Sequence, residues 1–208
     1  RVVILTGVGR GFSAGADLRD EVPRLVQQPL EDEYKPALMA ITMAPKPFIS
    51  AVNGAAAGIG SAFAMACDLC VMAEDAYIYQ AFAAIGLIPD GGATWHLVHQ
   101  LGRKRAYELI VGGEKLAAER CVELGLANRV VTADNLLQEA QAWAEQLADK
   151  APMSLRYSKD ALNKAMQNDL ADQISYEAYL QNLCFVSADS KEGVQAFLEK
   201  RKAMFSGK

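Results

Sequence analysis

The chain has 208 residues, of which 51% are hydrophobic, and carries a formal net charge of −4. This length and apolar content suit one domain with a sizeable core and a helical appendage. The acidic balance, without any block of Lys or Arg, argues against a nucleic-acid partner and an anionic membrane surface, so we expect a small-molecule or protein partner.

The first predicted elements are short, β-branched strands. Residues 2–6 (VVILT) and 48–52 (FISAV) are continuous apolar runs that lead into glycine, as in strands buried on both faces of a sheet. Residues 69–72 (LCVM) and 77–79 (YIY) predict two further strands, separated by a polar turn. Residues 61–67 (SAFAMAC) are compatible with a helix, which gives the order strand, glycine loop, helix, strand.

From about residue 101 the sequence predicts helices, which carry apolar residues at helical spacing and solvated charges. Only NRVVT at 128–132 predicts an extended segment. The layout is an α/β core over residues 1–140 followed by a helical region over 141–208. The charged segment 18–36, broken by prolines, predicts a mobile excursion from the core that covers a site. The opening RVVILTG has neither Met nor a signal peptide, so we expect an N-terminal segment to be missing.

The cysteines and histidines predict neither a metal site nor a redox site. The CDLC pair at 67–70 has no second CxxC and no His nearby in sequence, which favours small buried thiols in a reduced cytosol. His96 and His99 lie one helical turn apart without a third ligand, which favours helix-surface or pocket residues. The longest apolar run is rich in Ala and Gly rather than Leu and Ile, so we expect a cytoplasmic protein without a membrane span.

Two glycine-rich loops follow predicted strands. The first, TGVGRGFSAGADL, contains a GxSxG pattern, but Ser13 does not follow the strand directly, as a hydrolase nucleophile must. Phe12 stands where a dinucleotide fingerprint needs glycine. The second, AVNGAAAGIGSAF, leaves main-chain N–H groups open to an oxyanion at a helix start, although tight packing of helix on strand is an equal alternative for either loop.

One carboxylate, Asp90, stands in the otherwise apolar and glycine-rich stretch IGLIPDGGATW. One interpretation is a helix cap, with the carboxylate on free backbone N–H groups after Pro89. The other interpretation is a catalytic acid or base.

The order of these motifs resembles the enoyl-CoA hydratase/isomerase family, also called the crotonase superfamily. The resemblance runs from VVILTGVGRGFSAGADL through KPFISAVNGAAAGIGSAFAMACDL and IGLIPDGGATWHL to SKEGVQAFLEKRKAMF, essentially the whole chain, although the family's opening strands are absent. It implies an α/β, crotonase-like (ClpP/crotonase) fold of repeated ββα units. It also implies a C-terminal helical oligomerisation region that builds a homotrimer or a hexamer, and acyl-CoA substrates without a separate cofactor.

By position, the resemblance assigns an oxyanion hole to the backbone N–H groups of Ala16 and Ile59. Such donors stabilise the charge that a thioester carbonyl gains as its α-proton leaves. The resemblance and the small residues around both donors predict that substrate lies along Ala14, Gly15, Asp17, Leu18, Gly58, Phe82 and Ile88. The lining of the acyl pocket is expected within the irregular segment 18–47.

The departures from the family pattern matter as much. Ala62 and Phe82 occupy the positions of the two glutamates that family hydratases use, and neither side chain transfers a proton. In isomerase branches of the family the segment equivalent to IGLIPDGG carries the acid that faces substrate, which makes Asp90 the predicted proton shuttle. Desolvation by Phe82, Ile85 and Ile88 is expected to raise its pKa.

The sequence therefore predicts an acyl-CoA isomerase that converts a 3-enoyl thioester to its 2-enoyl form. Its substrates include ring-derived phenylacetate intermediates, since PDGGATW resembles that branch. The alternatives are an enoyl-CoA hydratase of the same family and a non-catalytic acyl-CoA binding protein. A dehalogenase-like relative with Asp90 as nucleophile lacks a halide-specific cue.

Overall fold

The computed structural model describes residues 1–19 and 25–208, which form two compact units. The larger unit comprises residues 4–42 and 48–142, and the smaller unit comprises residues 1–3, 43–47 and 143–208. Residues 20–24 of the expected excursion lie outside the described residues.

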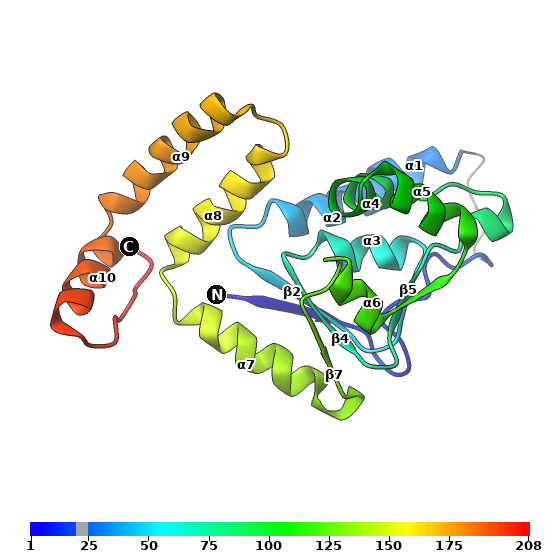
Figure 1. Cartoon of the computed structure of the whole chain (residues 1–208), viewed down its shortest axis with the longest axis horizontal. Helices are drawn as coiled ribbons and strands as arrows, with labels where there is room; N and C mark the ends of the chain where they lie inside the picture. The colour runs from blue at the N-terminus through cyan, green and yellow to red at the C-terminus, as the bar shows by residue number, and fades with distance from the viewer. Residues whose placement is uncertain (20–24) are drawn as a thin grey trace. The chain divides into compact units, whose positions relative to one another are not determined.

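The larger unit contains a four-stranded sheet in the order β1-β2-β4-β7 (Figure 1). Strand β2 pairs in parallel with β4, and β4 pairs in parallel with β7. Ala51 and Val52 of β2 are both fully buried, so both faces of that strand are covered, as its unbroken apolar run predicted. Strand β1 contains no buried residue, so the same prediction is wrong for residues 2–6. The strands are β1 (Val3–Thr6), β2 (Phe48–Val52), β4 (Leu69–Ala73) and β7 (Arg129–Val131).

A second sheet has three strands, β3 (Ala55–Ala57), β5 (Tyr77–Tyr79) and β6 (Lys115–Ala117). Strand β3 is parallel to β5, and β6 is antiparallel to β5. The sequence predicted β5 but interpreted β3 as loop, which is wrong. Three alanines between glycines carry little strand propensity, and β3 is extended because it pairs with β5 and bridges to Ser13. The prediction that only residues 128–132 are extended after residue 101 is also wrong, because β6 is a strand.

The segment after residue 25 is helical, so the prediction of an irregular segment over residues 18–47 is wrong for residues 27–42. It contains α1 (Gln27–Pro29), the π-helical turn η1 (Leu30–Tyr34) and α2 (Lys35–Thr42). In η1 the Lys35 N–H donates to the Leu30 carbonyl, an i to i−5 bond. Pro36 has no N–H to donate, and the wider π turn accommodates its ring where a regular helix would clash.

Helix α3 (Ile59–Ala66) follows β3 and packs against β2, with α2 and α4 on its other side (Figure 1). It is made almost entirely of small or apolar residues and is buried along most of its length, as expected for a helix enclosed in the core. The remaining helical elements of the larger unit are η2 (Ala83–Ile85), α4 (Ala93–Leu101), α5 (Arg103–Gly112), α6 (Ala118–Glu123) and η3 (Ala133–Asn135). Helix α7 (Leu136–Ala148) crosses the boundary between the units.

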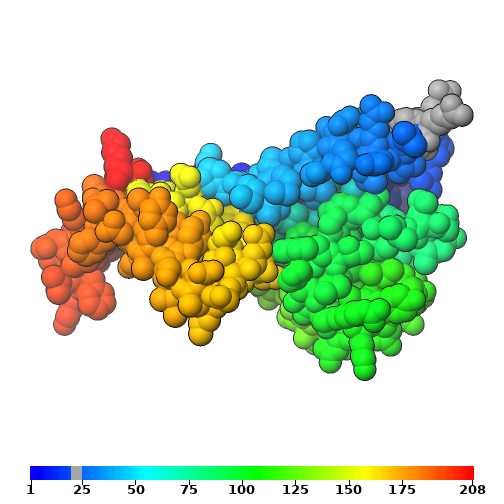
Figure 2. Space-filling model, turned by 90° about the horizontal axis from the view of Figure 1, so that it is seen from above, coloured from blue at the N-terminus to red at the C-terminus, as the bar shows by residue number. Residues whose placement is uncertain are grey.

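The smaller unit is helical, as predicted from its apolar spacing. It contains α8 (Pro152–Ala165), α9 (Leu170–Phe185) and α10 (Ala188–Glu199). Helices α8 and α9 lie side by side, yellow and orange in Figures 1 and 2. The Asp169 carboxylate caps α9 and the Ser187 hydroxyl caps α10 by accepting backbone N–H groups. None of the helices in the described ranges has both the length and the apolar content to cross a bilayer.

Candidate active site

The two glycine loops of the larger unit contact each other through their backbones. The Ser13 N–H donates to the Ala55 carbonyl at 2.9 Å, and the Ala57 N–H donates to the Ser13 carbonyl at 2.9 Å. Gly15 has a φ of +98°, and a Cβ there would lie 3.2 Å from the Ala57 carbonyl oxygen. These bonds fix the loop before Ala16 against the strand that leads into α3.

The two predicted oxyanion donors lie at the ends of these locked segments. Ile59 is the first residue of α3, so its N–H has no acceptor within the helix. Gly58 precedes it as N-cap with φ 53° and ψ −132°, a conformation that favours glycine. Ala16 follows Gly15, and its N–H has no acceptor among the residues that the structure describes. The two loops contact each other at Gly15 and Gly58, and each carries next to this contact an N–H group without an acceptor in the described part of the chain.

Asp90 does not cap a helix. The N-cap of α4 is Gly92, and that helix start receives no side-chain hydrogen bond. The Oδ1 atom of Asp90 is buried and has no hydrogen-bond partner within the described ranges. Burial raises the pKa of Asp90, and a hydrogen bond to its own backbone lowers it in part. The cap interpretation is therefore wrong, and the carboxyl group is held in an environment that favours its protonated form.

The turn after Asp90 packs on the first turn of α3. Gly91 has a φ of +58°, and a Cβ there would lie 2.8 Å from Cδ1 of Ile59 and 3.0 Å from Cβ of Ala62. No side chain fits between this turn and the helix, so glycine is needed for the close approach. The acid and the proposed donor at Ile59 therefore belong to directly contacting segments.

The two positions where family hydratases have glutamate, 62 and 82, are both buried near the second glycine loop. Ala62 is fully buried, and Phe82 is 6% exposed. A Cβ on Gly58 would lie 3.9 Å from Cζ of the Phe82 ring, which places the ring beside the second loop. Neither side chain carries a proton that it can transfer, so Asp90 is the titratable group of this constellation.

Several other residues that were predicted to contact Asp90 or the substrate are exposed to solvent. Ile85 and Ile88 are 52% and 80% exposed, so the prediction that they desolvate Asp90 is wrong for this chain. Ile85 is the last residue of the 3₁₀ turn η2 and Ile88 follows the turn, and both side chains are mainly exposed to solvent. Ala14, Asp17 and Leu18 are also exposed, which leaves their contact with substrate a prediction. Asp17 forms an ion pair with Arg19 at 3.3 Å.

Several other nucleophilic and titratable residues are not part of the group formed by Asp90 and the two backbone donors. The Ser13 hydroxyl accepts the Gly15 N–H at 3.3 Å, with no base among its partners in the described part of the chain. Burial raises the pKa of Cys70 to about 11 and that of Cys121 to about 12, so both thiols stay protonated. Burial, aided by the charge of His99, lowers the pKa of His96 to about 4. Over residues 1–19 and 25–208 no cluster of His, Cys, Asp and Glu is arranged to hold a metal.

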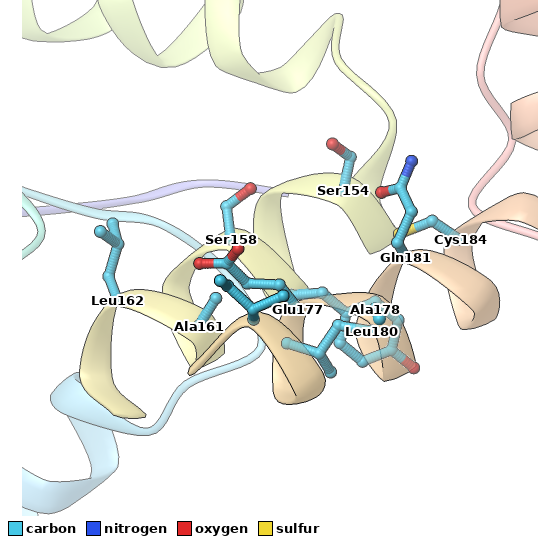
Figure 3. A pocket seen from close by; sticks show the side chains of 11 residues that line it. Ser154, Ser158, Ala161, Leu162, Glu177, Ala178, Leu180, Gln181 and Cys184 are labelled. Atoms are coloured by element: carbon cyan, nitrogen blue, oxygen red, sulfur yellow. The ribbon is translucent and has the colours of Figure 1, made fainter. Parts of the chain in front are cut away.

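A separate hollow of about 650 Å³ lies between α8 and α9 in the smaller unit (Figure 3). Leu162 and Leu180 supply apolar lining, and Ser158 and Glu177 supply polar lining. None of the predicted site residues lines it. The residues that line it have the spacing of ordinary amphipathic helices, so their sequence gives no sign of a pocket.

Sequence reasoning also missed two buried polar residues behind the second glycine loop. Ser61 is fully buried and Gln80 is 1% exposed. The only sequence signal was a glutamine directly after the apolar strand YIY.

Comparisons with known proteins agree on one family. The family model described as enoyl-CoA hydratase/isomerase matches residues 1–208. The chain is 41% identical over 215 residues to the 1,2-epoxyphenylacetyl-CoA isomerase of Escherichia coli K12, covering 100% of the chain and 82% of that protein. It is 40% identical over 210 residues to a probable enoyl-CoA hydratase of Rhodobacter capsulatus, again covering 100% of the chain and 82% of the relative.

A solved structure gives the same result for the fold. The crystal structure of an enoyl-CoA hydratase from Polaromonas sp. JS666 superposes with a TM-score of 0.94 at 38% identity, over 99% of this chain and 82% of that one. The predicted crotonase-like fold is therefore confirmed, with its parallel sheet and helical C-terminal region. On the match of its whole length to the family model, the chain belongs to the enoyl-CoA hydratase/isomerase family of enzymes.

Proposed function

We propose that this enzyme is an acyl-CoA double-bond isomerase that uses Asp90 as its proton shuttle. The observation that carries the proposal is the buried, unpartnered Oδ1 of Asp90, which lies in a turn that contacts the helix start at Ile59. Ala62 and Phe82 supply no second acid or base. Hydration needs both, and each is typically worth about 10²–10⁴-fold, whereas a double-bond shift needs one group that takes and returns one proton.

In the proposed reaction the thioester carbonyl accepts hydrogen bonds from the N–H groups of Ala16 and Ile59. The Asp90 carboxylate removes a proton from C2 of a 3-enoyl thioester, and the electron pair delocalises into a dienolate whose oxygen lies between the two donors. The protonated Asp90 then delivers the proton to C4, which forms the 2-enoyl product and restores the carboxylate. One proton moves from C2 to C4 and no water is consumed.

The raised pKa of Asp90 supports this role. A carboxyl group at its ordinary pKa is a weak base towards a carbon acid, and a pKa raised by burial brings it nearer to the operating pH. The similarity to a 1,2-epoxyphenylacetyl-CoA isomerase favours a ring-derived acyl group among the substrates. The similarity to probable hydratases makes weak hydration the competing activity to measure beside it.

The deciding experiment compares wild type with Asp90→Asn. Isomerisation of a 3-enoyl-CoA is followed by the absorbance of the conjugated product, and exchange of substrate α-protons with deuterated water is followed by NMR. We expect Asp90→Asn to bind the acyl-CoA as well as wild type does but to lose both rates by at least about 10²-fold.

The matched control is Asp75→Asn, which changes an exposed carboxylate of the turn between β4 and β5. It should retain both rates. Wild-type exchange rates in Asp90→Asn would contradict the proposal. Absence of both exchange and isomerisation in wild type, with acyl-CoA binding intact, would identify a binding protein, and hydration without isomerisation would identify a hydratase.

A further inference from the structure

A chain of two buried hydrogen bonds runs behind the second glycine loop. Nε2 of Gln80 donates to Oγ of Ser61 at 2.9 Å, and Oγ of Ser61 donates to the carbonyl oxygen of Gly58 at 2.7 Å. The backbone N–H of Ser61 donates to the same carbonyl oxygen at 3.0 Å. Both side chains are almost completely buried, so water does not compete for these bonds.

The direction of this chain is fixed by counting protons. A serine hydroxyl has one proton, and Ser61 uses it on the Gly58 carbonyl, which can only accept. The Ser61 oxygen must then accept from Gln80, so the amide NH₂ group of Gln80 faces it. This leaves Oε1 of Gln80 buried without a partner among the residues described, an arrangement that costs stability.

The carbonyl at the end of the chain belongs to the peptide unit that carries the proposed donor. In a trans peptide the C=O of Gly58 and the N–H of Ile59 point in opposite directions within one plane. Hydrogen bonds to the oxygen polarise the peptide and make its N–H a stronger donor. The preceding peptide is anchored as well, because the Gly58 N–H donates to the Tyr79 carbonyl at 3.0 Å, next to Gln80.

We propose that Ser61 and Gln80 are positioning residues that orient and polarise the Gly58–Ile59 peptide of the oxyanion hole. The inference rests on the proposed use of the Ile59 N–H as an oxyanion donor. It explains why a glutamine with an unsatisfied oxygen is kept in the core next to α3. A leucine of similar volume would avoid that cost, but it would leave the serine hydroxyl without its donor.

The test compares Ser61→Ala with Ser50→Ala as matched control. Ser50 is also fully buried, and its hydroxyl donates to the Ala64 carbonyl at 3.1 Å, later in the same helix α3. Each variant removes one buried serine hydroxyl, so both should lower the thermal midpoint. Only Ser61→Ala removes a bond to the Gly58 carbonyl.

The readout is the infrared carbonyl band of a saturated acyl-CoA that carries ¹³C at the thioester carbonyl. Binding to wild type should shift this band to lower frequency, because the oxyanion donors polarise it. Ser61→Ala should lose most of the shift and lower kcat about tenfold with little change in KM, less than the loss of a whole donor. Ser50→Ala should keep both the shift and kcat.

Two further variants keep the test decisive if Ser61→Ala folds poorly. Ser61→Cys retains a weak donor and should give an intermediate band shift. Gln80→Met removes the amide together with its unsatisfied oxygen, so we expect a reduced band shift with a thermal midpoint close to that of wild type. A purely structural glutamine would give the opposite pattern, with a lower midpoint and an unchanged band.

The outcomes separate this inference from the function on which it rests. If wild type leaves the carbonyl band unshifted, the oxyanion hole itself is refuted, and the proposed function is refuted with it. If wild type shifts the band and the variants at Ser61 and Gln80 shift it equally, only the positioning role is refuted.

Discussion

Replacing Asp90 with asparagine should stabilise the fold at neutral pH even as it removes the proposed base. Burial raises the pKa of Asp90 above its unfolded value of about 3.9. Between the unfolded pKa and the higher folded pKa of Asp90, the folded state binds more protons than the unfolded state. The free energy of unfolding therefore falls as the pH rises through this window. Above the folded pKa the cost of the buried charge is fully present. Asparagine is uncharged throughout.

The magnitude follows from the unpartnered Oδ1 of Asp90. A buried polar atom without a partner costs about 1–3 kcal/mol, and more when it is charged. Asparagine leaves a polar amide at the same place, so only the charge-dependent part is recovered, about 1 kcal/mol. For a chain of this size that corresponds to a rise in Tm of about 2–4 °C.

Differential scanning calorimetry of wild type, Asp90→Asn and the exposed control Asp75→Asn measures this difference. We expect the gain of Asp90→Asn at pH 8 to shrink as the pH falls through the folded pKa of Asp90 and to vanish below the unfolded value of about 3.9, where the wild-type carboxyl is protonated in both states. Asp75→Asn should show no such dependence. A lower Tm for Asp90→Asn at pH 8 would mean that the carboxylate is held by stabilising contacts, and the reasoning from its burial would be refuted.

The remaining predictions concern the backbone of the site, one histidine and the surface of the smaller unit. Gly91→Ala places a Cβ 2.8 Å from Cδ1 of Ile59 at a φ of +58°, so we expect isomerisation to fall by about tenfold or more in a variant whose circular dichroism is unchanged. Gly15→Val, at a φ of +98°, should abolish acyl-CoA binding in calorimetry, and unchanged affinity in a folded variant would remove this loop from the site. The pKa of His96 is about 4 in the fold and about 6.5 when unfolded, so the unfolded state binds more protons between these values. The free energy of unfolding of wild type should therefore fall by up to about 3 kcal/mol as the pH falls from 6.5 to 4. His96→Gln should flatten that loss in urea titrations, and a persisting slope would assign it to another group. Phe197 is 83% exposed on α10, one of several exposed apolar side chains there, so light scattering should report a trimer or a multiple of it, and a stable monomer at low micromolar concentration would contradict this.

Local sequence was enough to predict the elements whose residues alone favour one conformation. The β-branched runs at 2–6 and 48–52 form strands, of which the second is buried on both faces, and the amphipathic segments after residue 101 are helices. Strand β3 was not predictable, because Ala56 is extended only through its pairing with Ile78. Pro36 also misled the prediction, because its effect as a helix breaker is absorbed by a π turn that residue preferences do not reveal.

The sequence likewise indicated some features of the candidate site, whereas others became visible only in the structure. Glycine spacing indicated which loops carry free N–H groups, and the solitary acid among apolar residues indicated Asp90. The burial of its Oδ1 and the failure of the cap interpretation needed the packing of Gly91 on α3. The role inferred for Gln80 needed the hydrogen bond to Ser61, which lies 19 residues earlier in the chain. No local pattern encodes a contact of that kind.

The packing of Gly91 against α3 also constrains how reactions diversify on this scaffold. Both proposed donors are main-chain groups, so a side-chain substitution that touches neither their peptides nor the Ser61–Gln80 pair behind them leaves them in place, and a new acid or base can be added without rebuilding them. Position 62 is the exception, because Cβ of Ala62 lies 3.0 Å from the place a Gly91 Cβ would occupy. A longer side chain at 62 would start from this close approach of the 89–92 turn, so we expect these positions to covary in evolution. A library that randomises position 62 alone should yield fewer folded enzymes than one that varies it together with residues 89–92.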